Sequence, residues 1–94
     1  MWSTVEDVHD VQLYQHVMAV NFFGSVYCTK SALPFLKAAQ GRIVVISNVA
    51  SLTGVPAHSA YCASMHAMNG FFESLRIELA GTGVTITIVV PDFV

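Results

Sequence analysis

The stretch SAYCASMHAMNGFFESLRIELA (residues 59–80) has the pattern of a long helix and decides the predicted fold. Gly81 and Gly83 follow it, and glycine permits the left-handed turn that ends a helix. Two short runs of β-branched and apolar residues flank this helix, at 41–48 and 84–90. Strands that are apolar on both faces are typical of the middle of a parallel sheet. The order strand, helix, strand therefore predicts two parallel strands joined by a right-handed crossover.

A second long helix is predicted over residues 5–39. Its apolar side chains surround the helix rather than forming one stripe, which predicts burial on more than one side. We expect Pro34 to kink or divide this helix and Gly41 to end it. The fold class is therefore α/β, a partial doubly wound fold of two parallel strands and two long helices. The loop at 49–58 should leave the carboxyl end of the first strand, where ligands bind in open α/β sheets.

The composition indicates surfaces that other protein should cover. The 94 residues are 54% hydrophobic and 11% charged, whereas an ordinary soluble domain has about 25% charged residues. A membrane span would explain this, but polar residues, glycine and proline interrupt the uncharged runs at 11–29 and 43–72. We therefore expect no membrane insertion. Missing parts of a larger domain, or a partner subunit, would cover these surfaces instead.

Charge and cysteine content exclude further classes. The net charge is −2 and the chain has only four basic residues, so we expect no nucleic-acid partner. Cys28 and Cys62 lack the spacing of metal ligands, and no signal peptide opens the chain. We expect no metal site, two buried reduced thiols and a cytoplasmic location.

Four segments together resemble one family. YCAS opens the helix at 59–80, SN ends the strand at 41–48, VMAVNFFGSV lies in the first helix and VVPDFV closes the chain. This arrangement resembles the short-chain dehydrogenase/reductases from about Val8 onward. The resemblance implies that residues 1–94 are a fragment of a single NAD(P)-binding Rossmann-type domain, its C-terminal part.

The resemblance also implies a catalytic site. Family members move a hydride between NAD(P) and an alcohol or carbonyl carbon, using an Asn, a Ser, a Tyr and a Lys. Asn21 and Tyr61 match the asparagine and the tyrosine, Asn48 stands at the serine position and Met65 at the lysine position. A free tyrosine has a pKa near 10 and needs a cation to act as a base at neutral pH, and methionine has no charge. Asn48 can still donate to a substrate oxygen, whereas His66 lies about 100° round the helix from Met65 and should not replace the lysine.

The cofactor implied by the resemblance is NAD or NADP. Met65, Pro91 and Asp92 are the positions of this sequence that would adjoin it, and family members usually have Gly where Asp92 stands. A negative charge there is unfavourable beside an anionic cofactor. The Gly-rich turn that receives the pyrophosphate in the family is absent from these 94 residues. We expect no tight NAD(P) binding by this chain alone.

Three hypotheses follow. The first is a piece of an NAD(P)-dependent oxidoreductase for a small-molecule alcohol and carbonyl pair, inactive as given. The second is a pseudoenzyme, a non-catalytic assembly module that forms homo-oligomers through its two long helices. The third is a membrane-associated hydrophobic peptide.

Overall fold

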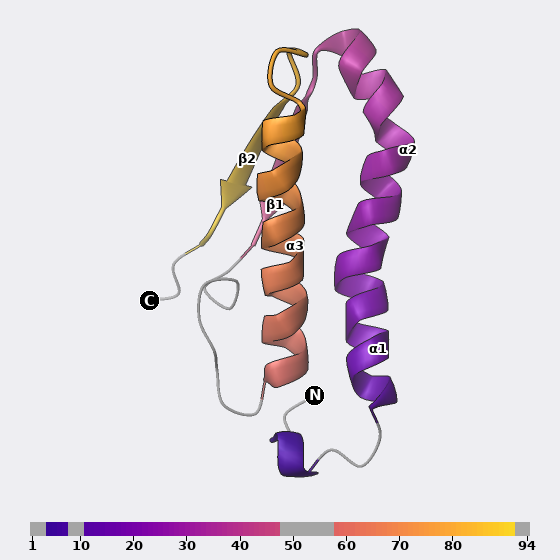
Figure 1. The fold of residues 1–94 in the computed structure, drawn as a ribbon, viewed down its shortest axis with the longest axis vertical. Helices are drawn as coiled ribbons and strands as arrows, with labels where there is room; N and C mark the ends of the chain where they lie inside the picture. The colour runs from indigo at the N-terminus through magenta and orange to yellow at the C-terminus, as the bar shows by residue number, and fades with distance from the viewer. Residues whose placement is uncertain (1–3, 8–10, 48–57, 92–94) are drawn as a thin grey trace.

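The fold is known from a computed structural model, which describes residues 4–7, 11–47 and 58–91. In chain order the elements are η1 (Val5–Asp7), α1 (Gln12–Met18), the π-helical turn η2 (Ala19–Phe23), α2 (Gly24–Ala39), β1 (Arg42–Ile46), α3 (Ser59–Glu78) and β2 (Thr85–Val89). Figure 1 shows α1 and α2 end to end, in one long column that stands beside α3. The two strands lie on the other side of α3 from this column in that view.

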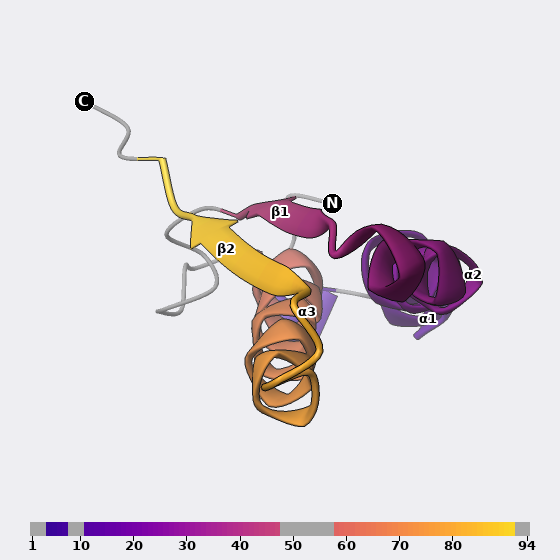
Figure 2. The ribbon, with the colours of Figure 1, turned by 90° about the horizontal axis from the view of Figure 1, so that it is seen from above.

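The two strands pair in parallel, as the sequence predicts. Their register runs from Arg42 opposite Thr85 to Ile46 opposite Val89. Gly81 and Gly83, in the turn between α3 and β2, have φ angles of 86° and 87°, which confirms the expected left-handed turn. Seen from above, α3 lies under one face of the sheet (Figure 2). The predicted α/β fold with two parallel strands and long helices is confirmed.

The core is one apolar stripe of α3 packed against one face of the sheet. Its members on and just after α3 recur every three or four residues, as one helical face requires. They are Cys62, Met65, Met68, Phe72, Leu75 and Leu79, and they meet Val45, Val84 and Ile86 from the strands. Full burial of one such large side chain contributes about 1.5–3 kcal/mol. This contact is the main source of stability in the described residues.

A second contact joins α3 to the first half of the helical column. Both α1 and η2 pack along α3. Phe22 of η2 meets Phe71 of α3 edge to face, with ring centroids 6.2 Å apart and planes at 88°. Such an aromatic pair adds about 0.5–1.5 kcal/mol beyond its buried area. The turn η2 is therefore held directly against α3.

The long helix predicted at 5–39 differs from the structure in three ways. The described residues form η1 and then a column that begins at Gln12 and changes from α to π geometry at Ala19. Pro34 does not divide α2, which continues through it to Ala39. The helix ends at Ala39, the predicted last residue, but Gln40 rather than Gly41 takes the left-handed conformation, with φ 52°. Gly41 has its own constraint, since a β-carbon there would lie 2.9 Å from Cδ2 of Leu36.

The apolar side chains on the second face of each element are exposed in the chain by itself. On the strands, Val44, Ile46 and Val89 are exposed because α3 covers only one face of the sheet. On the helical column, Tyr27 and Phe35 are exposed. That missing parts of a larger domain or a partner subunit cover these surfaces stays a prediction. No described helix is both long and apolar enough to cross a membrane.

We expect Phe72→Ala to lower the free energy of unfolding by about 3 kcal/mol, because it empties a buried position in the core. Phe35→Ala is the matched control, since Phe35 is 77% exposed and Phe72 only 4%. The control should change stability by less than about 0.5 kcal/mol. Urea unfolding followed by circular dichroism measures both, and equal losses would contradict the core described above.

Candidate functional site

Tyr61 lies in the first turn of α3, close to the carboxyl end of β1. The helix begins at Ser59, after His58 at its N-cap position, and Tyr61 is half-buried. A cavity of about 280 Å³ adjoins it, lined by Val20, Asn21, Ser25, Ile46, Tyr61, Met65 and Met68. Ile46 is the last residue of β1. The cavity therefore lies where open α/β sheets bind ligands.

This cavity brings together three of the residues selected from the sequence. Asn21 comes from η2, whereas Tyr61 and Met65 come from successive turns of α3. The turn η2 is suited to such a place, because π-helical turns are rare and frequently occur at functional sites. Residues forty positions apart in the chain thus form one wall.

A hydrogen-bonded chain connects Asn21 to the turn that carries Tyr61. The side-chain amide Nδ2 of Asn21 donates to Oγ of Ser64 over 3.1 Å. Oγ of Ser64 in turn donates to the carbonyl oxygen of Tyr61 over 2.7 Å. The sequence reasoning missed Ser64, although it is the serine of YCAS, three residues after the tyrosine. The signal that could have identified Ser64 is a polar side chain among the apolar positions of the predicted helix.

Met65 gives the cavity wall an uncharged thioether. Its side chain is 6% exposed, and no described residue that lines the cavity carries a charge. His66, the next residue, is exposed and is not among the lining residues. Its Nδ1 donates to the carbonyl oxygen of Cys62 over 2.7 Å. His66 therefore does not supply the missing cation, as its angle on the helix predicts.

The remaining selected residues lie at or beyond the ends of the strands. Asn48 and Asp92 are outside the described residues. Pro91 is half-buried just after β2 and is not among the residues that line the cavity. Ser47, next to Asn48, is buried, and its hydroxyl has no hydrogen-bond partner among the described residues.

Both cysteines were predicted to be buried, and the prediction is correct for one of them. Both thiols are free, and Cys62 is buried as expected, but Cys28 is exposed. Cys28 lies on α2, whose residues Leu33 and Leu36 are the ones packed against the core. Among the described residues, no group of three or more His, Cys, Asp or Glu side chains could hold a metal ion.

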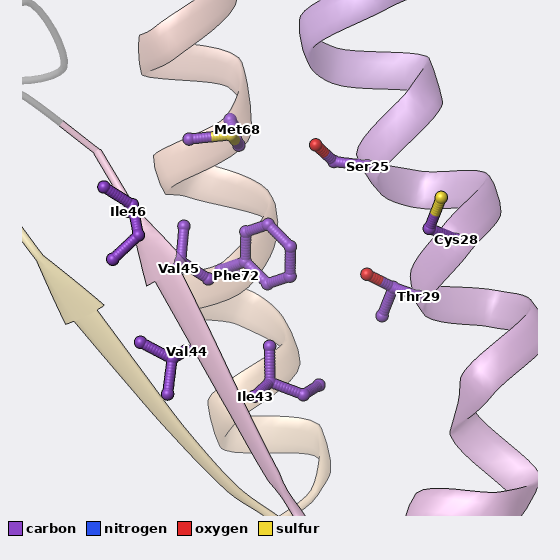
Figure 3. A pocket seen from close by; sticks show the side chains of 9 residues that line it. All are labelled: Ser25, Cys28, Thr29, Ile43, Val44, Val45, Ile46, Met68 and Phe72. Atoms are coloured by element: carbon purple, nitrogen blue, oxygen red, sulfur yellow. The ribbon is translucent and has the colours of Figure 1, made fainter.

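A second cavity lies between α2 and β1, as Figure 3 shows. Its volume is about 310 Å³ and its lining residues are Ser25, Cys28, Thr29, Ile43, Val44, Val45, Ile46, Met68 and Phe72. In Figure 3, Ser25 and Thr29 project from α2 toward the side where Met68 and Phe72 lie. The lining contains no carboxylate, imidazole or amine. This cavity is therefore a poor candidate for proton transfer.

Comparisons with known proteins agree with this geometry. A family model described as short chain dehydrogenase matches residues 2–94. An 11-beta-hydroxysteroid dehydrogenase A of Sesamum indicum is 44% identical over 92 residues, which are 98% of this chain and 26% of that relative. The chain thus spans about a quarter of that relative's length.

Solved structures give the same fold. A short chain dehydrogenase of Burkholderia cenocepacia, in complex with NADP, superposes with a TM-score of 0.88 at 28% identity. The match covers 96% of this chain and 38% of that one. An acetoin dehydrogenase of Salmonella typhimurium also gives a TM-score of 0.88, at 27% identity over 97% of this chain and 38% of its own.

One contact fixes the start of α3 and offers a test. The hydroxyl groups of Tyr14 in α1 and Ser59 in α3 share a hydrogen bond of 2.8 Å. We expect Tyr14→Phe to lower the free energy of unfolding by about 1 kcal/mol, the usual contribution of one hydrogen bond. Thermal or urea unfolding measures the change.

Tyr27→Phe is the matched control for Tyr14→Phe, because it removes the same atom from an exposed side chain. It should leave stability within about 0.5 kcal/mol of the parent chain. If Tyr14→Phe is equally neutral, the bond to Ser59 does not hold α3.

Proposed function

Because this chain belongs to the short-chain dehydrogenase family, we propose that it is part of an NAD(P)-dependent oxidoreductase for an alcohol and carbonyl pair, inactive as it stands. The observation that carries the proposal is the cavity in which Tyr61, Asn21 and Met65 meet. The names of two similar proteins, a hydroxysteroid dehydrogenase and an acetoin dehydrogenase, support a hydroxyl or carbonyl substrate. The activity is proposed for a longer protein, since this chain spans 26% of the Sesamum relative.

The residues of the chain take the following roles in this proposal. By the family resemblance, the hydroxyl of Tyr61 would exchange a proton with the substrate oxygen, and the amide of Asn48 would donate a hydrogen bond to that oxygen. Asn21 stabilises the cavity wall that it shares with Tyr61. Pro91 and Asp92 would adjoin the cofactor. Met65 stands where a lysine would stabilise the deprotonated tyrosine, and a thioether cannot do so.

The described lining of the cavity does not fit the charged groups of a dinucleotide. Asn21, Ser25 and Tyr61 offer one amide and two hydroxyl groups, and Met65 replaces the only cation that the resemblance implies. An anionic cofactor is held by cations or by backbone amides of a Gly-rich turn at a helix N-terminus. This poor fit supports the proposal that the chain by itself is inactive.

A chimera tests the proposal. Residues 1–94 replace the matching segment of a full-length active relative, and NADPH oxidation is followed by absorbance. We expect almost no turnover from this chimera. Met65→Lys together with Asn48→Ser should raise turnover by about 10²–10⁴, the usual contribution of general acid–base catalysis.

His66→Lys together with Asn48→Ser is the matched control for the chimera. It adds the same charge one residue later, on an exposed position outside the cavity, so it should not restore turnover. Equal gains from the two lysine variants, or full turnover by the unsubstituted chimera, would refute the assigned roles. Calorimetric titration with NADP⁺ separates failure of cofactor binding from failure of proton transfer.

A second candidate function is an assembly module, and the exposed aromatic side chains of the helical column favour it. Phe23, Tyr27 and Phe35 are 48%, 68% and 77% exposed. Large apolar patches on a protein surface commonly mark contacts with another protein. We propose that the column pairs with a second copy of the chain, which would make the protein a homo-oligomer without requiring any catalysis.

We expect the double variant Tyr27→Glu, Phe35→Glu to shift the chain to monomers in sedimentation velocity, because two charges would be buried in the contact. Ser74→Glu is the control, since it adds a charge at an exposed polar position of α3, outside the column. A parent chain that sediments as a monomer at all concentrations would exclude this function.

A further inference from the structure

We propose that Ser64 is a positioning residue that holds the π-helical turn η2, and with it Asn21, against the turn of α3 that carries Tyr61. The functional meaning of this link rests on the roles proposed above for Asn21 and Tyr61. The link itself is a property of the folded chain. It can therefore be tested without any enzymatic activity.

The burial of Ser64 shows that its hydroxyl is not an ordinary surface group. Its side chain is 0% exposed, whereas serines are mostly exposed in proteins. A serine inside a helix commonly satisfies its hydroxyl with the carbonyl oxygen one turn earlier, as Ser64 does with Tyr61. The second bond, from Asn21, crosses between two helices and has no such local explanation.

Asn21 is held at two points. Its side-chain amide donates to Ser64, and its backbone carbonyl accepts a 2.8 Å hydrogen bond from Oγ of Ser25 in α2. Ser25 also lines the cavity beside Tyr61, and Figure 3 shows it on the side of α2 that faces α3. The bond from Ser25 is a local one within the helical column, four residues along the chain. The bond to Ser64 is therefore the one of the two that joins the π-helical turn to another element.

Apolar packing alone would not select this geometry. Phe22 packs on Phe71 in the same region. The free energy gained from apolar burial is roughly proportional to the buried area and does not depend on direction. The hydrogen bond from Asn21 to Ser64 depends on both distance and angle. Ser64 therefore fixes the orientation of η2, while Phe22 fixes its proximity to α3.

Nuclear magnetic resonance of the ¹⁵N-labelled chain tests the proposal through two signals. The first is the side-chain amide of Asn21, and the second is the hydrogen exchange of the backbone amides at 19–23. Ser64→Ala should shift the Asn21 signal and speed exchange at 19–23 by about fivefold, the effect of one lost hydrogen bond of about 1 kcal/mol. Ser74→Ala, at an exposed serine of the same helix, should change neither signal.

Asn21→Ala gives a second route if Ser64→Ala does not fold. It leaves the bond from Ser64 to the Tyr61 carbonyl in place, so no buried hydroxyl loses its acceptor. We expect the same faster exchange at 19–23, and no further increase in the double variant, because both changes remove one shared bond. Unchanged exchange at 19–23 in Asn21→Ala, or fully additive effects, would overturn the proposal. Neither result would bear on turnover in the chimera, so the two proposals fail separately.

Discussion

The packing of one face of α3 on one face of a two-stranded sheet is the contact on which the rest of the structure depends. Met68, Phe72 and Leu75 meet Val45, Val84 and Ile86 there. The two strands cannot be stable by themselves, since a pair of strands needs an apolar layer to cover it. The helical column reaches α3 through α1 and η2, and Leu33 and Leu36 of α2 pack against the edge of the core. The same helix thus orders the sheet, the column and the cavity beside Tyr61.

This single layer also explains the exposed apolar side chains. Val44, Ile46 and Val89 point to the face of the sheet that α3 does not cover, and Tyr27 and Phe35 lie on the outer part of the column. The strand sequences are apolar on both faces, as is usual for strands of a parallel sheet that is covered on both sides. A longer protein of this family, or another copy of the chain, would supply the missing layer in our proposals.

Local sequence signals predicted the elements better than their irregularities. The β-branched runs, the two glycines after α3 and the order of elements predicted the parallel pair correctly. Pro34 was expected to kink or divide a helix that in fact continues through it, whereas the π-helical turn that contains Asn21 was not predicted. A π-helical turn depends on partners in other elements, here Ser64 and Ser25. Ser64 was missed because its role requires a helix 43 positions away in the chain.

The sequence by itself determined the family and the strand and helix order, and it is the source of the prediction that Tyr61, Asn21 and Met65 stand at the positions of the family's site. These are properties of local spacing and side-chain chemistry, which do not require knowledge of neighbours. Only the tertiary structure decided that Asn21 and Met65 share a cavity with Tyr61, that Ser64 joins η2 to α3, and that Cys28 is exposed. The reason is physical: burial and tertiary hydrogen bonds depend on which elements pack together, and that packing is set by the whole chain.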